Sequence, residues 1–273
     1  MPATPETLTE YVSSLCDTGY APASIRVAIA TVRTAHAEMG HDGQPDTRRA
    51  LEVLKVHGRD RADAGHSEDD ATPVTVKALR LMIDALPSTG DKALRDRAIL
   101  VLGFALMARR SELVGLRRTD ITETLHGLEV RIRKSKTDQA GKGAQVNLPR
   151  GQFPDTDPVR VLGAWLAAVD QAGHHDGLIF RSISRWGRIG RALQGRAVSV
   201  IVQDAARQAG LPNPERYSAH SLRAGGATEA YKAGVPITTI CDHGRWKRGS
   251  PVVLGYIRAV DRWRDNAMSG VGL

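Results

Sequence analysis

A stretch with almost no large apolar side chain divides this 273-residue chain. It covers residues 59–73, reads RDRADAGHSEDDATP, and is charged and punctuated by glycine and proline. Such a segment contributes nothing to a hydrophobic core, which favours a linker between two domains. We therefore predict a helical domain over residues 1–66, a linker over 67–74 and a second domain over 75–273.

The first domain is predicted to be helical throughout. Thr4 followed by Pro5 is typical of a helix cap with proline at the first helical position, and apolar residues then recur at helical spacing. A second helix is expected from about Ala23 to Met39, with Met39 facing inward. A third helix is expected to end near Gly58.

The second domain combines helices with a small sheet. Leu128, Val130 and Ile132 alternate with polar residues, as in a strand, and Val146 and Leu148 indicate its partner across a KTDQAGKG turn. Helices are expected over residues 75–87, 91–107, 158–171, 196–209, 219–233, 236–243 and 250–264, with a short one after Arg110. The predicted fold class is mainly α with a small antiparallel β-sheet, that is, α+β.

The charge of the chain is unevenly distributed. The formal net charge is +8, yet residues 1–73 carry 7 Lys and Arg against 12 Asp and Glu, a net charge of −5. Residues 74–273 therefore carry +13, and a cationic body of this kind attracts nucleic acid. With only 3 Phe, 5 Tyr and 4 Trp, a stacking platform for single strands is not indicated, which favours duplex DNA.

Several other classes of protein are disfavoured. The longest run without charged or strongly polar residues, residues 98–108, is too short to span a bilayer, and the polar start is unlike a signal peptide. We therefore expect a cytoplasmic protein that is not associated with a membrane. Carboxylates are scattered and no P-loop is present, so neither a two-metal nuclease nor ATP use is indicated. We expect no cofactor and no metal, and we interpret the His174-His175-Asp176 cluster as a polar loop.

Candidate catalytic residues begin after the apolar helix 91–107. Arg109 follows it in the segment ALMARRSELVGL. An arginine there is costly to bury without an anionic partner, and Glu112 is the nearby candidate. Lys136 lies in RKSKTDQ at the tip of the predicted hairpin, where a lysine is ordinarily solvated.

The remaining candidates lie in the last quarter of the chain. His220 and Arg223 stand three residues apart at the start of a predicted helix, so they share one face, and helix starts favour anions. Trp246 follows a Gly-Arg turn, and Tyr256 comes ten residues later. Each of these residues has an ordinary structural explanation by itself, so their order along the chain carries the argument.

That order resembles the tyrosine recombinase (phage integrase) family: an arginine, a lysine, a His-x-x-Arg pair, a tryptophan and a tyrosine near the end. ARRSELVGLRRTDI is similar to the family's first arginine box, and HSLRAGGATEAYKAGV is similar to its second. RWKRGSPVVLGYIRAVDRWRDNAM is most similar to the Cre-like branch, in which tryptophan replaces the commoner histidine. The resemblance covers residues 75–266 and, more loosely, the helical first segment.

The resemblance implies that Arg109 and Arg223 clamp the scissile phosphate while Tyr256 attacks it, giving a 3′-phosphotyrosine and a free 5′ hydroxyl. Fixed guanidiniums suit this role because attack adds negative charge to the phosphate oxygens. A tyrosine needs a base or cationic surroundings to become a nucleophile. The R-x-S-E-L register selects Arg109 over Arg110, and Tyr231, the best rival nucleophile, is interpreted as packing within its helix.

By the same resemblance, Lys136 protonates the leaving 5′ oxygen, His220 acts in proton transfer and Trp246 packs against the site. Glu112 supports the first arginine.

Two of these positions keep alternatives. Lys134 and Lys142 compete with Lys136 in the same loop. His243 competes with Trp246, although it lies thirteen residues before the tyrosine whereas the tryptophan lies ten before it.

The implied function is site-specific recombination, in which duplex DNA is cut and rejoined without metal or ATP. The implied assembly is a C-shaped clamp of two domains, a dimer at each site and a homotetramer on DNA. A tail containing Val260, Trp263 and Met268 is expected to dock on a neighbouring subunit, so deleting residues 259–273 is expected to impair synapsis. The alternatives are relaxation of supercoils by a type IB topoisomerase and a DNA-binding protein without catalysis.

DNA contacts are expected from both domains. The predicted helix 196–209 resembles the segment that Cre-like proteins place in the major groove, with Arg196 and Arg207 as candidate contacts. In the first domain Arg26 and Arg33 are the candidates, on a basic face that could also include Arg48, Arg49 and Lys55.

Overall fold

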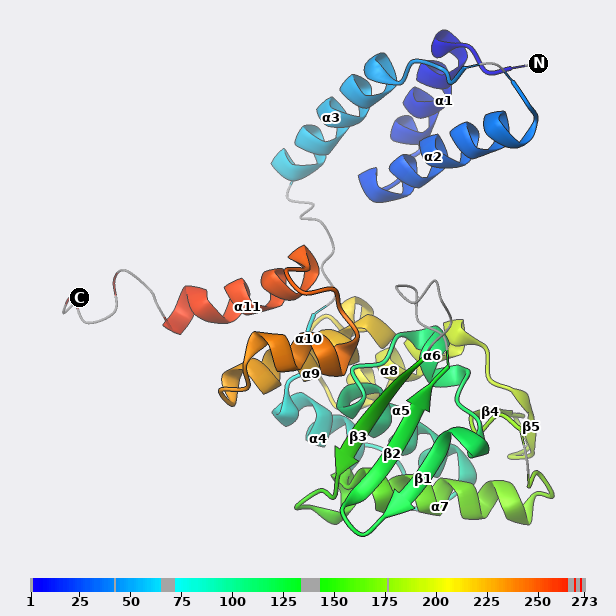
Figure 1. Cartoon of the computed structure of the whole chain (residues 1–273), viewed down its shortest axis with the longest axis vertical. Helices are drawn as coiled ribbons and strands as arrows, with labels where there is room; N and C mark the ends of the chain where they lie inside the picture. The colour runs from blue at the N-terminus through cyan, green and yellow to red at the C-terminus, as the bar shows by residue number, and fades with distance from the viewer. Residues whose placement is uncertain are drawn as a thin grey trace. The chain divides into compact units, whose positions relative to one another are not determined.

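The computed structural model describes residues 2–41, 43–64, 72–133, 143–175 and 177–264, together with Met268 and Val271. The chain divides into two compact units, Met1–Asp70 and Ala71–Leu273 (Figure 1). In these described ranges, none of the helices has both the length and the apolar character that crossing a membrane requires.

The first unit packs three helices around one small core. They are α1 (Pro5–Asp17), α2 (Pro22–Glu38) and α3 (Arg48–Asp63). The Thr4 hydroxyl accepts a hydrogen bond from the Thr7 N–H, which is the predicted cap of α1. The core holds Leu8, Val12, Ile25, Ile29, Ala50 and Leu54.

Two expectations for the first unit were wrong. Met39 is 73% exposed, because it caps α2 beyond the last turn that packs inward. α3 continues past Gly58 to Asp63, so residues 59–63 are helical. Residues 59–63, RDRAD, are of types that an exposed helix tolerates. Gly58 lowers the stability of the helix by only about 1 kcal/mol relative to alanine. Residues 65–71, which include residues 67–71 of the predicted linker, lie outside the described residues.

The second unit is built around a buried helix, α5 (Asp91–Ala105). It packs against α7 (Pro158–Gln171) and α9 (Ala219–Lys232). Trp165 of α7 is fully buried, and its indole N–H donates to the Ile179 carbonyl at 2.9 Å. The second half of α5, residues 98–105, carries no charged or polar side chain, as expected for a helix segment that is covered on several sides.

One face of this core is a three-stranded antiparallel sheet. Its strands are β1 (Ile121–Thr124), β2 (Gly127–Ile132) and β3 (Ala144–Pro149), in the order β1-β2-β3. Val130 pairs with Val146 and Leu128 with Leu148, which confirms the predicted strand pair. The KTDQAGKG turn falls largely outside the described residues. The α+β fold class is confirmed.

A second, two-stranded hairpin was not predicted. It pairs β4 (Arg181–Ile183) with β5 (Ile189–Ala192) and leads into α8 (Gly195–Gln208). Its tip carries Trp186, which is 72% exposed and lies under the Arg185 guanidinium at 4.0 Å.

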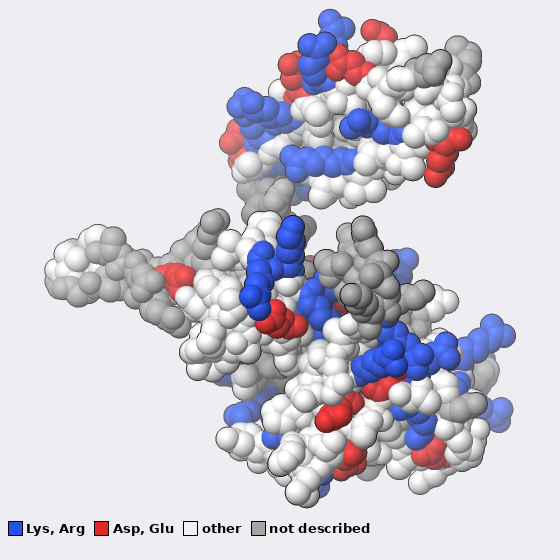
Figure 2. Space-filling view, viewed as in Figure 1, with Lys and Arg blue, Asp and Glu red and all other residues white. Residues whose placement is uncertain are grey.

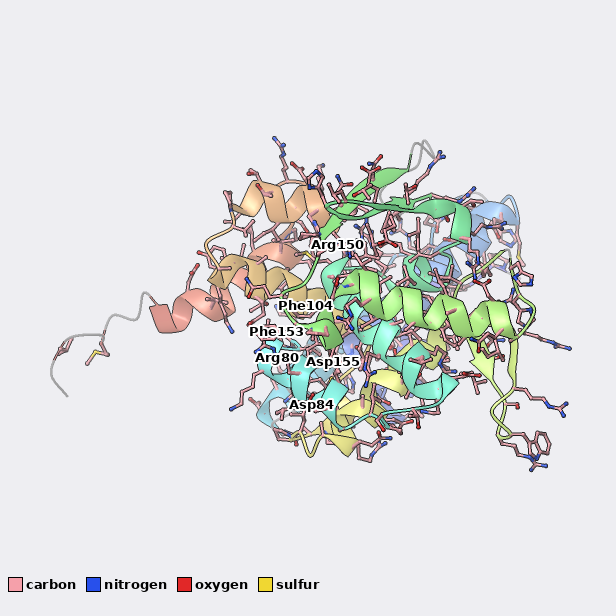
Figure 3. All side chains as sticks on the ribbon, turned by 90° about the horizontal axis from the view of Figure 1, so that it is seen from below. Arg80, Asp84, Phe104, Arg150, Phe153 and Asp155 are labelled. Atoms are coloured by element: carbon pink, nitrogen blue, oxygen red, sulfur yellow. The ribbon has the colours of Figure 1, made fainter. Side chains whose placement is uncertain are left out.

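The remaining helices frame the unit. α4 (Val76–Asp84) packs near a turn of 3₁₀ helix, where the Arg80 guanidinium lies 4.2 Å from the centre of the Phe153 ring (Figure 3). Short α6 (Arg110–Val114) follows α5. The last two helices are α10 (Ile237–Gly244) and α11 (Pro251–Arg264).

A separate apolar cluster anchors the last two helices on α9. Its buried members are Met107, Ala227, Ile240, Cys241, Val253 and Ile257. The start of α9 is in turn fixed by close backbone contact with Val74, whose N–H donates to the Ser221 carbonyl at 3.0 Å. A Cβ at Gly225 would lie 2.0 Å from the Val74 carbonyl oxygen, so glycine is required at that approach. The segments that carry the candidate catalytic residues are therefore held against one another.

Candidate active site

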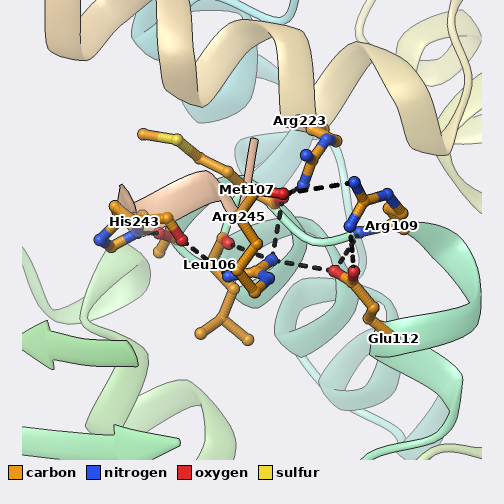
Figure 4. Close-up of polar contacts among 8 residues, drawn as sticks. Leu106, Met107, Arg109, Glu112, Arg223, His243 and Arg245 are labelled. Carbon is orange, nitrogen blue, oxygen red and sulfur yellow. Dashed lines mark hydrogen bonds and ion pairs between the residues drawn. The ribbon is translucent and has the colours of Figure 1, made fainter. Parts of the chain in front are cut away.

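The site is assembled around the turn that joins α5 to α6. Met107 adopts a left-handed backbone conformation there, with φ at 46°. Its carbonyl accepts hydrogen bonds from Arg223 Nη1 and, at 3.2 Å, from Arg245 Nη2 (Figure 4). The turn thus exposes a backbone acceptor to two arginines that lie more than a hundred residues away in the sequence.

Glu112 lies beneath this turn and is 6% exposed. Its carboxylate accepts the Arg109 backbone N–H at 2.9 Å, Arg109 Nη1 at 2.5 Å and Arg245 Nη2 at 2.9 Å. Burial raises the pKa of Glu112, but the charge of Arg245 and the hydrogen bonds from both arginines outweigh it, so the pKa lies below its ordinary value of 4.5. Glu112 is therefore an anion at neutral pH.

Arg223 is 2% exposed and stacks on an aromatic ring. Its guanidinium carbon lies 3.7 Å from the centre of the Trp246 indole. Burial and the neighbouring charge of Arg109 lower the pKa of Arg223 to about 9. Its Nη2 has no hydrogen-bond partner among the described residues. A buried cation with an unsatisfied donor indicates that an anion belongs beside it.

The Trp246 ring lies against the end of α10. A Cβ at Gly244 would come within 1.8 Å of the indole Cζ3, so this glycine makes room for the ring. The ring centres of Trp246 and Tyr256 are 6.3 Å apart, in an edge-to-face arrangement. Trp246 therefore lies between the buried arginine and the tyrosine, as a packing residue.

Tyr256 reaches back from α11 to the start of α9. Its hydroxyl oxygen lies 2.5 Å from Nε2 of His220. The His220 backbone N–H donates to the Ser218 hydroxyl at 3.1 Å, which holds the imidazole in the first turn of α9. A neutral imidazole with its proton on Nδ1 accepts the phenol proton in this geometry.

A cavity of about 350 Å³ lies beside these groups. It is lined by Ala108, Arg109, Arg110, Ser199, Ser218, Ala219, His220 and Arg223. Its lining contains three arginines and no carboxylate, which suits an anion such as a phosphate. Figure 2 shows Lys and Arg side chains gathered on the face of the second unit around α6.

Six of the predicted residues thus come together: Arg109, Glu112, His220, Arg223, Trp246 and Tyr256. Lys136 and its alternatives Lys134 and Lys142 lie outside the described residues.

The alternatives to the other residues have different surroundings. His243 Nε2 donates to the Ala105 carbonyl at 2.8 Å, and this hydrogen bond holds α10 against α5. Burial lowers the pKa of His243. The Tyr231 hydroxyl donates to the Asp261 carboxylate at 2.9 Å. Arg110 shares the wall of the cavity with Arg109.

Sequence reasoning missed Arg245. It is 7% exposed and ends α10 in a left-handed conformation with φ at 57°, which turns it inward. The Gly-Arg-Trp sequence was interpreted only as a turn before Trp246, and a turn gives no sign that its arginine is buried.

The expected DNA contacts are solvent-exposed. Arg196 lies in the first turn of α8, and Arg207 lies in its last turn, paired with Asp204 at 2.6 Å. Arg26 and Arg33 are exposed on α2. No group of three His, Cys, Asp or Glu side chains able to hold a metal occurs among the residues described.

Comparisons with known proteins place this geometry in context. The sequence model of the Phage integrase family matches residues 74–261. An integrase/recombinase XerD homolog of Selenomonas ruminantium is 32% identical over 270 residues, which cover 98% of this chain and 77% of that protein. The Cre recombinase of Escherichia phage P1 is 24% identical over 277 residues, covering 95% and 77%.

Solved structures share the fold. XerH recombinase bound to palindromic difH, in a post-cleavage complex, matches with a TM-score of 0.66 at 16% identity, covering 96% of this chain and 73% of that one. A lambda integrase dimer bound to a COC′ core site matches with a TM-score of 0.58 at 16% identity, covering 94% and 81%.

The buried Glu112 carboxylate leads to a stability prediction. Glu112→Gln leaves Arg109 and Arg245 without their anion, and we expect it to destabilise the second unit by about 3 kcal/mol at pH 7. Because the folded pKa is depressed, the carboxylate's contribution is complete above the unfolded value of 4.5 and is lost as pH falls through the folded pKa. The difference in the free energy of unfolding between wild type and Glu112→Gln therefore becomes smaller below pH 4.5.

Urea unfolding followed by tryptophan fluorescence measures this effect, because all 4 Trp lie in the second unit. Glu123→Gln is the matched control, since Glu123 pairs with Arg150 at the surface, and we expect a change below about 0.5 kcal/mol. Equal effects of the two substitutions, or a difference that does not depend on pH, would contradict the ion-pair account.

Proposed function

The chain belongs to the phage integrase family and is a tyrosine-type site-specific recombinase, and from this premise we propose that Tyr256 cuts duplex DNA and remains joined to its 3′ phosphate. One observation carries the proposal. The Tyr256 hydroxyl lies 2.5 Å from His220 Nε2, and His220 lines the same cavity as Arg109 and Arg223. The residues proposed as nucleophile, proton acceptor and phosphate-binding cations thus lie close together, which supports the proposal.

Arg109 and Arg223 bind the scissile phosphate. Attack on a phosphodiester places extra negative charge on its non-bridging oxygens, and fixed cations in a partly dry site stabilise that charge by about 3 kcal/mol each. Arg223 is suited to this role because its buried Nη2 donor has no partner among the described residues. An anion beside it raises its depressed pKa again, so binding and charge are coupled.

Tyr256 is the nucleophile. Its phenol proton passes to His220 Nε2 as the phenolate oxygen forms a bond to phosphorus. The bond from phosphorus to the 5′ oxygen breaks, and this oxygen takes up a proton. We assign that proton to Lys136, which lies outside the described residues.

Rejoining reverses these steps. A 5′ hydroxyl attacks the phosphotyrosine, and Tyr256 leaves and recovers its proton. The covalent link retains the energy of the phosphodiester bond, so the cycle balances without ATP or a metal ion.

Both units contribute to binding DNA in this proposal. The first unit, over residues 1–66, grips DNA through Arg26 and Arg33, and Arg196 and Arg207 at the two ends of α8 contact a groove. The hairpin that precedes α8 adds Arg185, Arg188 and Arg191 to the cationic surface. The solved structures contain XerH bound to its palindromic difH substrate and lambda integrase bound to a COC′ core site, which supports a DNA site as the partner. The proposed location is the prokaryotic cytoplasm, at the nucleoid.

The relatives are recombinases and integrases, which favours recombination over supercoil relaxation by a type IB topoisomerase and over binding without catalysis. We propose that a dimer binds each site and that two sites form a homotetramer. Residues after α11, including Met268, dock on a neighbouring subunit in this assembly.

Covalent trapping tests the role of the tyrosine. Wild-type protein mixed in EDTA with nicked fragments of its source genome is expected to retain DNA through denaturing detergent, whereas Tyr256→Phe retains none, because it lacks the attacking oxygen. Tyr231→Phe is the control, since Tyr231 bonds to Asp261 and is not the nucleophile. Equal capture by wild type and Tyr256→Phe would show that another residue attacks.

A truncation tests the assembly. Deletion from residue 259 would cut α11 and remove Asp261, the partner of Tyr231, so we place the deletion at residues 265–273 instead. We expect binding of one protomer to a half-site to stay within about twofold, while paired-site complexes in native gels fall at least tenfold, since many interface contacts are lost together. Unchanged recombination by the truncated protein would rule out the docking role.

A further inference from the structure

We infer that Arg245 is a positioning residue that holds Arg109 and Arg223 in their phosphate-binding places. The inference rests on the proposed function. Arg245 is 7% exposed and is absent from the lining of the cavity, so it does not reach the phosphate itself. It acts on the residues that do.

The Arg245 guanidinium is bound on several sides by protein. Nη2 donates to the Glu112 carboxylate at 2.9 Å and to the carbonyls of Leu106 and Met107 at 3.0 and 3.2 Å. Nη1 donates to the His243 carbonyl at 2.7 Å. These acceptors belong to the end of α5, to α6 and to α10, so one side chain connects all three segments.

Each phosphate-binding arginine shares an acceptor with Arg245. Arg109 shares Glu112, and its Nη2 also donates to the Arg245 backbone carbonyl at 3.4 Å. Arg223 shares the Met107 carbonyl. Trp246, which follows Arg245 directly, stacks on Arg223. Figure 4 shows the three guanidiniums converging on Glu112 and Met107.

The charges explain why a second cation is needed at Glu112. If the buried Glu112 carboxylate were paired with Arg109 alone, its negative charge would offset most of the positive potential that Arg109 presents to a phosphate. Arg245 supplies the additional positive charge, and among the causes that lower the Glu112 pKa its charge is the largest. Arg109 is therefore oriented by Glu112 but keeps charge for a phosphate.

The backbone supports the same interpretation. Arg245 has φ at 57°, a conformation that glycine adopts more easily than arginine. Because this backbone conformation is strained for a residue other than glycine, the contacts of the Arg245 side chain must offset the strain. In this chain the side chain does so by filling the space between α5, α6 and α10.

The test is the single-turnover rate of covalent cleavage on a nicked site recovered by trapping. We expect Arg245→Met to bind this DNA as wild type does but to cleave it about 100-fold more slowly, because small displacements of catalytic groups have effects of that size. Arg245→Lys keeps the charge but reaches fewer acceptors, so its loss is about tenfold. Arg248→Gln, which removes an exposed arginine three residues away, leaves the rate unchanged.

The combination with Arg109→Ala separates positioning from a general effect on folding. If Arg245 acts through Arg109 and Arg223, then adding Arg245→Met to Arg109→Ala slows cleavage by much less than the about 100-fold expected for Arg245→Met in the wild type, because only its effect on Arg223 is left. Losses that multiply, or an Arg245→Met rate within threefold of wild type, would overturn the inference. So would unfolding of both Arg245 variants, because that assigns the residue to the fold. If wild type itself forms no adduct, the proposed function fails and not this inference alone.

Discussion

The buried carboxylate of Glu112 is the interaction on which the rest of the site depends. Taking a carboxylate out of water is costly unless cations and hydrogen bonds surround it, and Arg109 and Arg245 provide both. The contacts with this anion orient Arg109 and hold Arg245 at the end of α10. Arg245 in turn fixes the turn after α5 through the Leu106 carbonyl. The turn in turn presents the Met107 carbonyl to Arg223. A structural ion pair thus determines where the two arginines proposed to bind the phosphate lie.

The tyrosine depends on a different kind of contact. Apolar packing between α9, α10 and α11 sets the position of Tyr256. Gly244 leaves room for the Trp246 ring, which lies between Tyr256 and Arg223. The polar network positions the arginines, and the apolar cluster positions the proposed nucleophile. His220, at the start of α9, lies where the two meet and contacts the Tyr256 hydroxyl.

Much of this arrangement could be predicted from the sequence. Helical periodicity predicts the long helices, and strand alternation predicts the β2–β3 pair. The order of the candidate residues indicates the grouping of Arg109, His220, Arg223, Trp246 and Tyr256. Other features depend on tertiary context. The strand ITET and the hairpin around Trp186 are short and polar, so they carry no periodic signal. The burial of Arg245 follows from its left-handed backbone and from Glu112, and neither is visible in a Gly-Arg-Trp sequence.

The most direct test of the account is to identify the residue that carries DNA in the trapped adduct. Digestion of the adduct with nuclease and trypsin, followed by mass spectrometry, isolates the peptide GSPVVLGYIR, residues 249–258, which contains a single tyrosine. The account predicts a residual nucleotide on this peptide, with fragmentation assigning it to Tyr256. A nucleotide on Ser250, or on a peptide that contains another tyrosine, would contradict it.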